Sequence, residues 1–170
     1  MSHSQNKMNC CLKKAEKELK NGDTHRGFII MPADKDKAKK HVIKAEHYIE
    51  ATIYLKKGNF SDISASTAFY ATYHCLLAIA AKFGYESRNQ ECTFALIATL
   101  IEDGNIDFDR DLLAKIYDFQ SRNDHSEQTI VEIREQYQYG TSLSLKENLY
   151  DEQLALVKRI ITKTKEIIEK

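Results

Sequence analysis

The stretch Ala65–Gly84, ASTAFYATYHCLLAIAAKFG, decides the fold. Lys82 is its one charged residue, and the apolar side chains surround the helix rather than forming one stripe. The segment is nearly long enough to cross a bilayer, but polar side chains interrupt its first half: Thr67, Tyr70, Thr72, Tyr73 and His74. A helix that is apolar almost all round is typical of the centre of a bundle. We therefore expect a central core helix whose most buried side chains include Ala68, Cys75, Leu76, Ile79 and Phe83.

Helical patterns flank this segment on both sides. Apolar residues recur at steps of three and four, and glycines follow several of the patterns, often after lysines. Helices are predicted near residues 34–57, 62–83, 88–103, 108–121, 125–139 and 145–168, after a short amphipathic helix near 6–21. No alternating run is long enough to require a strand. The links are short, so the prediction is an all-α fold, an antiparallel helical bundle of about five to six helices.

Capping residues support the predicted helix starts. Asp34 can cap the helix that begins there. Three further pairs fit the capping-box pattern: Ser87 with Gln90, Asp124 with Glu127, and Ser144 with Glu147. Residues 21–33 contain Gly22, Gly27 and Pro32 and are predicted to be a linker, whose apolar segment 28–31 packs on the rest of the molecule. Residues 1–32 are therefore expected to precede a bundle domain over 33–170.

The charge balance gives little information about partners. The 170 residues carry 25 basic and 25 acidic side chains, so no strong overall field points to a nucleic acid or a membrane. Residues 1–60 hold 13 Lys and Arg against 7 Asp and Glu, a local balance of +6. This basic half can contact phosphates, or it can simply be a solvated lysine-rich surface.

The cysteines and the first residues indicate a cytoplasmic location. Cys10 and Cys11 are adjacent, while Cys75 and Cys92 fall inside apolar helical patterns, and no pair has zinc or redox-motif spacing. We expect free thiols in a reducing cytosol. Residues 1–7 lack the apolar core of a secretory signal. No metal-binding constellation, glycine-rich phosphate loop or other cofactor motif is present, and no membrane association is expected.

Two segments resemble the HEPN family (higher eukaryotes and prokaryotes nucleotide-binding). The first is the segment FYATYHCLL at residues 69–77, and the second is IREQYQYG at 133–140. An amphipathic helix ending in Lys-Gly-Asn-Phe precedes the first segment, and the order of features resembles stand-alone prokaryotic HEPN proteins over about residues 33–170. The resemblance implies the same helical bundle and a homodimer whose groove lies between the two chains.

The resemblance also implies a possible chemistry. Many HEPN proteins are metal-independent endoribonucleases that act as toxins or in phage defence, with an arginine followed four to six residues later by a histidine. Here the arginine matches Arg134, but Tyr139 stands five residues on. A histidine titrates near neutral pH, whereas a tyrosine has a pKa near 10 and is a poor base there. The resemblance thus implies Arg134 and Tyr139 as the catalytic pair.

Two histidines are weaker catalytic candidates. His74 lies beside Tyr70 and Tyr73 on the central helix, where it either reaches the groove or is a hydrogen-bonded core residue. His125 follows Arg122 too closely for the family motif, and the Asp124 beside it is also explained as a helix cap. The residues expected around the nucleotide, RNA or dimer groove are Tyr70, Tyr73, His74, Arg134, Tyr137 and Tyr139.

Three functional hypotheses follow. The first is a non-catalytic dimeric module that binds a nucleotide, an RNA or a partner protein, such as a nucleotidyltransferase or an antitoxin. The second is a metal-independent endoribonuclease of toxin–antitoxin or phage-defence type, kept open by Arg134. The third is a structural homodimer without a small ligand. The tyrosine at position 139 favours the first and third hypotheses.

Overall fold

Helix α3 (Ser61–Lys82) forms the core of the molecule, as its apolar sequence predicts. Thirteen of its 22 residues are buried, and Ala68, Cys75, Leu76 and Ile79 are at most 1% exposed. Phe83 was predicted to be equally buried, but it lies just past the end of the helix and is only half-buried. By length and composition α3 could cross a membrane, yet 61% of its most apolar window is buried inside the protein.

The computed structural model describes residues 2–118 and 128–170. Within these residues the chain forms seven helices and two short strands. The elements other than α3 are α1 (His3–Lys20), β1 (Phe28–Ile30), α2 (Lys35–Lys57), β2 (Tyr85–Ser87), α4 (Gln90–Glu102), α5 (Arg110–Ile116), α6 (Ile130–Tyr139) and α7 (Glu147–Glu169). The all-α bundle is confirmed, with one small sheet that the sequence did not predict.

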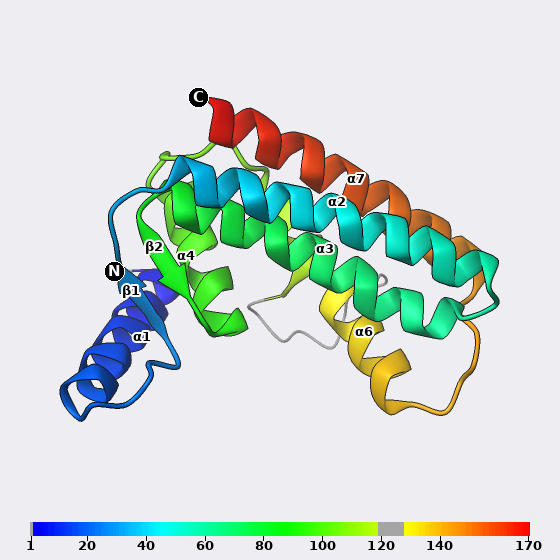
Figure 1. Ribbon diagram of the computed structural model, residues 1–170, viewed down its shortest axis with the longest axis horizontal. Coiled ribbons are helices and arrows are strands. Elements are labelled where there is room, and N and C mark those ends of the chain that lie inside the picture. Colours follow the sequence, from blue (N-terminus) through cyan, green and yellow to red (C-terminus); the bar gives the residue numbers. More distant parts are fainter. Residues whose placement is uncertain (1, 119–127) are drawn as a thin grey trace.

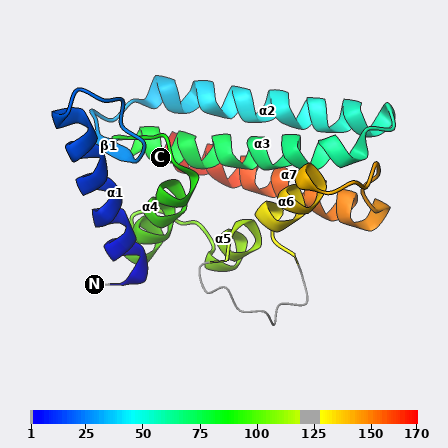
Figure 2. The ribbon, with the colours of Figure 1, turned by 90° about the horizontal axis from the view of Figure 1, so that it is seen from below.

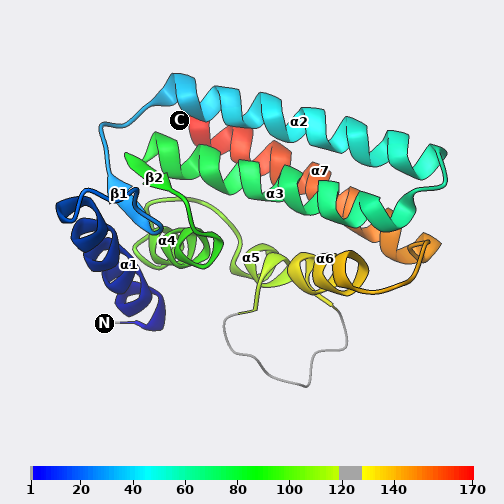
Figure 3. The same cartoon turned by 60° about the horizontal axis from the view of Figure 1, so that its bottom comes forward.

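The helices form two layers, and α3 lies in the layer of long helices. The long helices α2, α3 and α7 lie side by side, and α2 runs opposite to the other two (Figure 1). The shorter helices α4, α5 and α6 follow one another along the other side of α3 (Figures 2 and 3). Helix α1 lies at one end of the molecule, next to α4 and the antiparallel sheet of β1 and β2. One apolar cluster from α3, α4, α5, α6 and α7 fills the space between the layers.

Of the predicted caps within the described residues, one forms, one is replaced by another residue and one has no side-chain replacement. Asp34 caps α2 as predicted, since its Oδ1 accepts the Lys37 N–H at 2.8 Å. The Ser87 box is wrong, because Ser87 ends β2 and the side chain of Asn89 caps α4 instead. The Ser144 box is also wrong. The Leu145 N–H donates to Ser61 Oγ at 2.9 Å, which holds that residue outside the helix, and α7 begins at Glu147.

Helices α5 and α6 are shorter than predicted. The prediction for α5 reached residue 121, but Tyr117 has an extended backbone with φ −152° and ψ 129°, and the helix ends at Ile116. Helix α6 begins at Ile130 rather than near 125, because Thr129 and Glu132 form its capping box. The predicted cap at Asp124 and the candidate His125 lie outside the described residues.

A disulfide joins α1 to α4, so the prediction of free thiols is wrong for two of the four cysteines. Cys11 and Cys92 are bonded across 81 residues of sequence, with Cα atoms 6.0 Å apart. Cys10 is exposed and Cys75 is buried, and both are free thiols. Phe28 is fully buried against this disulfide, so the predicted linker segment does pack on the rest of the protein. No short spacing motif marks a pair this distant in sequence.

Candidate functional site

Two neighbouring stripes of α3 carry aromatic side chains. Phe69 and Tyr73 are one turn apart, and Tyr70 and His74 are their immediate neighbours in sequence. The rings of Phe69 and Tyr73 are stacked, with centroids 5.9 Å apart and planes at 10°. The edge of Phe69 meets Tyr70 at a centroid distance of 5.3 Å, so the two stripes form one continuous aromatic surface.

Helix α2 extends this surface with two further rings. The Tyr48 ring is stacked on Tyr70 and on His74, with a centroid distance of 5.5 Å in both pairs. His41 lies beside His74, with ring centroids 5.2 Å apart. We call these six side chains the aromatic network: His41, Tyr48, Phe69, Tyr70, Tyr73 and His74. Tyr70 is 41% exposed, so the network reaches the protein surface.

The two histidines form a hydrogen-bonded pair. The Nδ1 atoms of His41 and His74 are 3.0 Å apart, so one imidazole donates its N–H to the lone pair of the other. Burial, together with the neighbouring His41 and Lys44, lowers the pKa of His74 to about 4. Burial and the charge of Lys37 also lower the pKa of His41. Both rings are therefore neutral at pH 7, as a shared Nδ1 proton requires.

Arg134 lies over the other end of the network. Its guanidinium carbon is 4.3 Å from the centre of the Phe69 ring, in a cation–π arrangement. It donates to Gln90 Oε1 at 3.3 Å and to Glu135 Oε1 at 2.8 Å. The side chain is only 12% exposed, and its buried Nε has no hydrogen-bond partner within the described part of the chain. Arg134 thus keeps one unused donor while Glu135 balances its charge.

Tyr73 joins the network to the start of α4. Its hydroxyl lies 3.2 Å from Thr93 Oγ1, and burial raises the pKa of this phenol. Thr93 Oγ1 in turn donates to Ser87 Oγ at 2.7 Å. The phenol therefore stays protonated at neutral pH and acts here as a hydrogen-bonding group.

Helix α2 places positive charge beside the network. The Lys44 ammonium lies 5.1 Å from the centre of the Tyr48 ring. Lys37 precedes His41 by one turn on the same face, and it pairs with Glu86 at 3.2 Å. No group of three or more potential metal ligands occurs in residues 2–118 and 128–170. The chemistry available here is therefore stacking, hydrogen bonding and attraction of anions.

The structure brings together four of the six groove residues predicted from sequence. Tyr70, Tyr73 and His74 belong to the network, and Arg134 packs on it. Tyr137 instead packs in a separate apolar cluster with Ala65, Ile133, Leu145 and Tyr150. Tyr139 is 76% exposed at the last position of α6. Five positions on a helix differ by about 140° in direction, so Arg134 and Tyr139 point to different sides of α6.

Sequence reasoning missed three residues of this site. His41 and Tyr48 complete the ring stack from α2, and Gln90 accepts the bond from Arg134. A signal for the α2 residues was present, because Lys37, His41, Lys44 and Tyr48 recur at steps of four, three and four and so share one helix face. No such pattern marks Gln90.

Comparison with known proteins adds no family. No family model matches the chain, and a search of curated proteins also found no match.

Proposed function

We propose that this chain is a HEPN-like, non-catalytic module that binds nucleotides or RNA as a homodimer in the cytoplasm. The observation that carries the proposal is the stack of partly exposed rings formed by Tyr70, Tyr48 and His74. Proteins that bind single-stranded RNA hold unpaired bases on aromatic faces of this kind. A base stacked on the exposed Tyr70 would continue the existing stack.

The surrounding charge supports a phosphate-bearing ligand. Positions 35–44 of α2 contain five lysines, at 35, 37, 39, 40 and 44, and a single acidic residue, Asp36. Lys44 is close enough to contact the phosphate of a nucleotide whose base stacks beside Tyr48. Lysines that neutralise phosphates supply most of the sequence-independent affinity for a nucleic acid.

Two features favour binding over catalysis. Metal-free RNA cleavage needs a group that moves a proton near neutral pH and a cation that stabilises the phosphate. The exposed Tyr139 is a poor base, and the guanidinium of Arg134 is already bonded to Glu135. The alternative is a metal-independent endoribonuclease. One observation favours it: the Arg134 cation packs on the same aromatic network that contains the imidazoles of His41 and His74, although a pKa of about 4 makes His74 a weak base at pH 7.

Fluorescence anisotropy with a labelled single-stranded RNA tests the proposal. We expect Tyr70→Ala to weaken binding by about fivefold or more, because one stacked base contributes about 1–3 kcal/mol. Tyr54→Ala is the matched control, since Tyr54 is a 77% exposed tyrosine on α2 outside the network. Binding should also weaken with rising salt. A wild type that binds no RNA, DNA or free nucleotide would reject the proposal.

The same mixtures of protein and RNA distinguish a ribonuclease from a binding module. The RNA is recovered in a metal chelator and examined on a gel. Shortening by the wild type that is lost in Arg134→Ala and His74→Ala would establish the alternative instead. Intact RNA from the wild type and from Tyr139→His would leave the binding module. A nucleotidyltransferase or an antitoxin is the kind of protein partner that this module would serve.

A further inference from the structure

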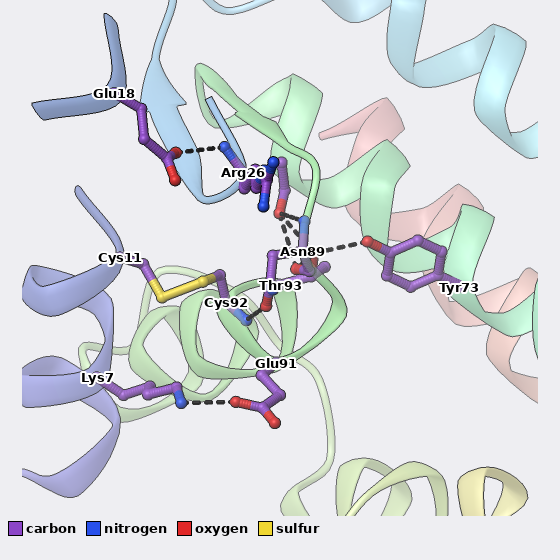
Figure 4. Close-up of a disulfide and its surroundings, with 10 residues drawn as sticks. Lys7, Cys11, Glu18, Arg26, Tyr73, Asn89, Glu91, Cys92 and Thr93 are labelled. Atoms are coloured by element: carbon purple, nitrogen blue, oxygen red, sulfur yellow. Dashed lines mark hydrogen bonds and ion pairs between the residues drawn. A yellow bond between two sulfur atoms is a disulfide. The ribbon is translucent and has the colours of Figure 1, made fainter. Parts of the chain in front are cut away.

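The first turn of α4 connects α1 to the aromatic network. Cys92 is bonded to Cys11 of α1, and the neighbouring Glu91 pairs with Lys7 of α1 at 2.6 Å (Figure 4). Gln90 and Thr93, which flank Glu91 and Cys92 in the sequence, contact the candidate site instead. Thr93 pairs with the Tyr73 hydroxyl. Four consecutive residues of α4 thus contact α1 and the candidate site in turn.

On the other side, Gln90 accepts a hydrogen bond from Arg134. Gln90 and Thr93 are one helical turn apart, and the disulfided Cys92 lies between them. The Asn89 side chain caps the same turn by accepting the Cys92 N–H at 3.0 Å. A displacement of Cys92 therefore acts on two hydrogen bonds: the one between Thr93 and Tyr73 of the network, and the one between Gln90 and Arg134, which packs on the network.

Hydrogen bonds also hold the start of α1 to the end of α4, where Ser2 and Ser4 donate to Glu102 at 2.6 and 2.7 Å and Gln5 donates to Asp103 at 3.2 Å. Only Ser4, Cys11 and Ala15 are buried among the 18 residues of α1. Its ion pair between Lys7 and Glu91 is exposed, and exposed pairs contribute little to stability. The apolar contacts around the disulfide are few, chiefly Phe28 with partly buried Met8 and Leu12. The Cys11–Cys92 bond is the covalent link between α1 and α4, and both cysteines are only 5% exposed, so a reductant reaches the sulfurs when α1 opens locally.

We infer that Cys11–Cys92 is a thiol–disulfide exchange site, through which a dithiol reductant releases α1 and loosens the α4 side of the aromatic network. A thiolate of the reductant attacks one sulfur of the pair, and the electrons of the broken S–S bond leave on the other sulfur, which takes up a proton. The second thiol of the reductant then attacks the mixed disulfide. The protein gains two thiols, and the dithiol becomes a disulfide.

The remaining cysteines define the specificity of this exchange. Burial raises the pKa of the Cys75 thiol to about 12, so Cys75 is inert as a nucleophile. Cys10 is exposed beside Cys11 but is not bonded. Disulfides that persist in cytosolic proteins are usually redox-sensing or transient, which is consistent with the location proposed above.

Amide hydrogen exchange of the full chain tests the inference, with dithiothreitol as the dithiol. Under denaturing conditions the air-oxidised protein should titrate two thiols and the reduced protein four. On reduction we expect α1 amides to exchange at least tenfold faster and the first turn of α4 to lose protection, while α7 is unchanged. Cys10→Ser is the matched control: it should titrate one thiol when oxidised and three when reduced, and its amides should respond to reduction as those of the wild type do.

The effect on the ligand rests on the proposed RNA binding, and we expect threefold to tenfold weaker binding after reduction. Four thiols after air oxidation, or equal α1 exchange in both states, would overturn the exchange site. Cys92→Ser should reproduce the reduced state, and loss of α7 protection in that variant would show unfolding, in which case the wild-type comparison decides. If exchange rates change but neither state binds RNA, the proposed function fails and the exchange site stands. Equal RNA affinity in both states would overturn the coupling.

Discussion

At the scale of single residues, burial decides which chemistry the site can offer. His41 and His74 are adjacent to Lys37 and Lys44, and both are half-buried, so both imidazoles are held neutral. The Arg134 guanidinium forms an ion pair with Glu135. The site therefore presents flat neutral rings with cations at the margins, which suits an unpaired base better than a reacting phosphate.

The histidine pair predicts how stability depends on pH. The pKa of His74 is about 4 in the folded protein, against 6.5 ordinarily, so the unfolded chain binds a proton first as the pH falls. The free energy of unfolding should decrease from about pH 6.5 to about pH 4. At this half-buried position we expect a loss on the order of 1 kcal/mol after solvent screening. Urea unfolding across this range measures it.

His74→Gln should flatten that dependence, because glutamine does not titrate. His47→Gln is the matched control, since His47 is an exposed histidine on α2, the helix that carries His41. An equal slope in the wild type and in His74→Gln would contradict the assignment of the pH dependence to this pair.

The candidate site was partly predictable from single residues. The FYATYH segment identified Tyr70, Tyr73 and His74, because aromatic side chains on a helix this apolar are conspicuous. It did not identify Tyr48, whose role depends on the alignment of α2 against α3. It also did not show that Arg134 and Tyr139 point to different sides of α6, because a motif spacing does not state in which direction each side chain points.

At the scale of elements, close approaches between segments decide what the local pattern leaves open. The helix periods predicted all seven helices, but their ends depended on neighbours such as Ser61, which bonds the backbone of Leu145. The small sheet was not predictable, because each strand has only three residues and the two strands lie far apart in the sequence. Its strands meet because Met31 donates to the Gly84 carbonyl at 2.8 Å, next to the end of α3.

Gly84 is the residue on which this junction depends. Its φ is +78°, and a Cβ there would lie 2.6 Å from the Met31 carbonyl oxygen, which is backbone and cannot turn away. We expect Gly84→Ala to destabilise the protein by about 2–4 kcal/mol, from the unfavourable φ and the clash together. Gly104→Ala is the matched control, because Gly104 has φ +70° and open space around it. It should cost about 1 kcal/mol. Equal losses in urea unfolding would contradict the clash.

At the scale of the whole molecule, α1 and the small sheet are an attachment to a bundle that the other helices complete. The apolar cluster that contains Cys11, Phe28 and Cys92 is separate from the main core. Sequence analysis separated residues 1–32 from the bundle on composition alone, but it could not foresee a covalent link across 81 residues. Such a link is a property of the folded arrangement, since nothing local in the sequence selects Cys11 over Cys10.

The predicted homodimer also belongs to this scale. Aromatic side chains are the residues that most often anchor interfaces, and Tyr70 and Tyr139 are 41% and 76% exposed on the elements expected to line the groove. Sedimentation velocity at tens of micromolar should give twice the single-chain mass of 19.6 kDa. Tyr139→Asp should weaken dimerisation by tenfold or more, because it replaces an apolar contact with a charge.

Ile30→Asp is the control for this charge substitution. Ile30 is 70% exposed on β1, at the end of the molecule away from α6 (Figure 1). A dimer formed at the groove should persist in Ile30→Asp and dissociate in Tyr139→Asp. Equal dissociation in the two variants would place the interface elsewhere, and a single-chain mass for the wild type would reject the dimer. If RNA affinity falls in Tyr139→Asp together with the dimer, then the binding groove is completed by the second chain rather than contained in one.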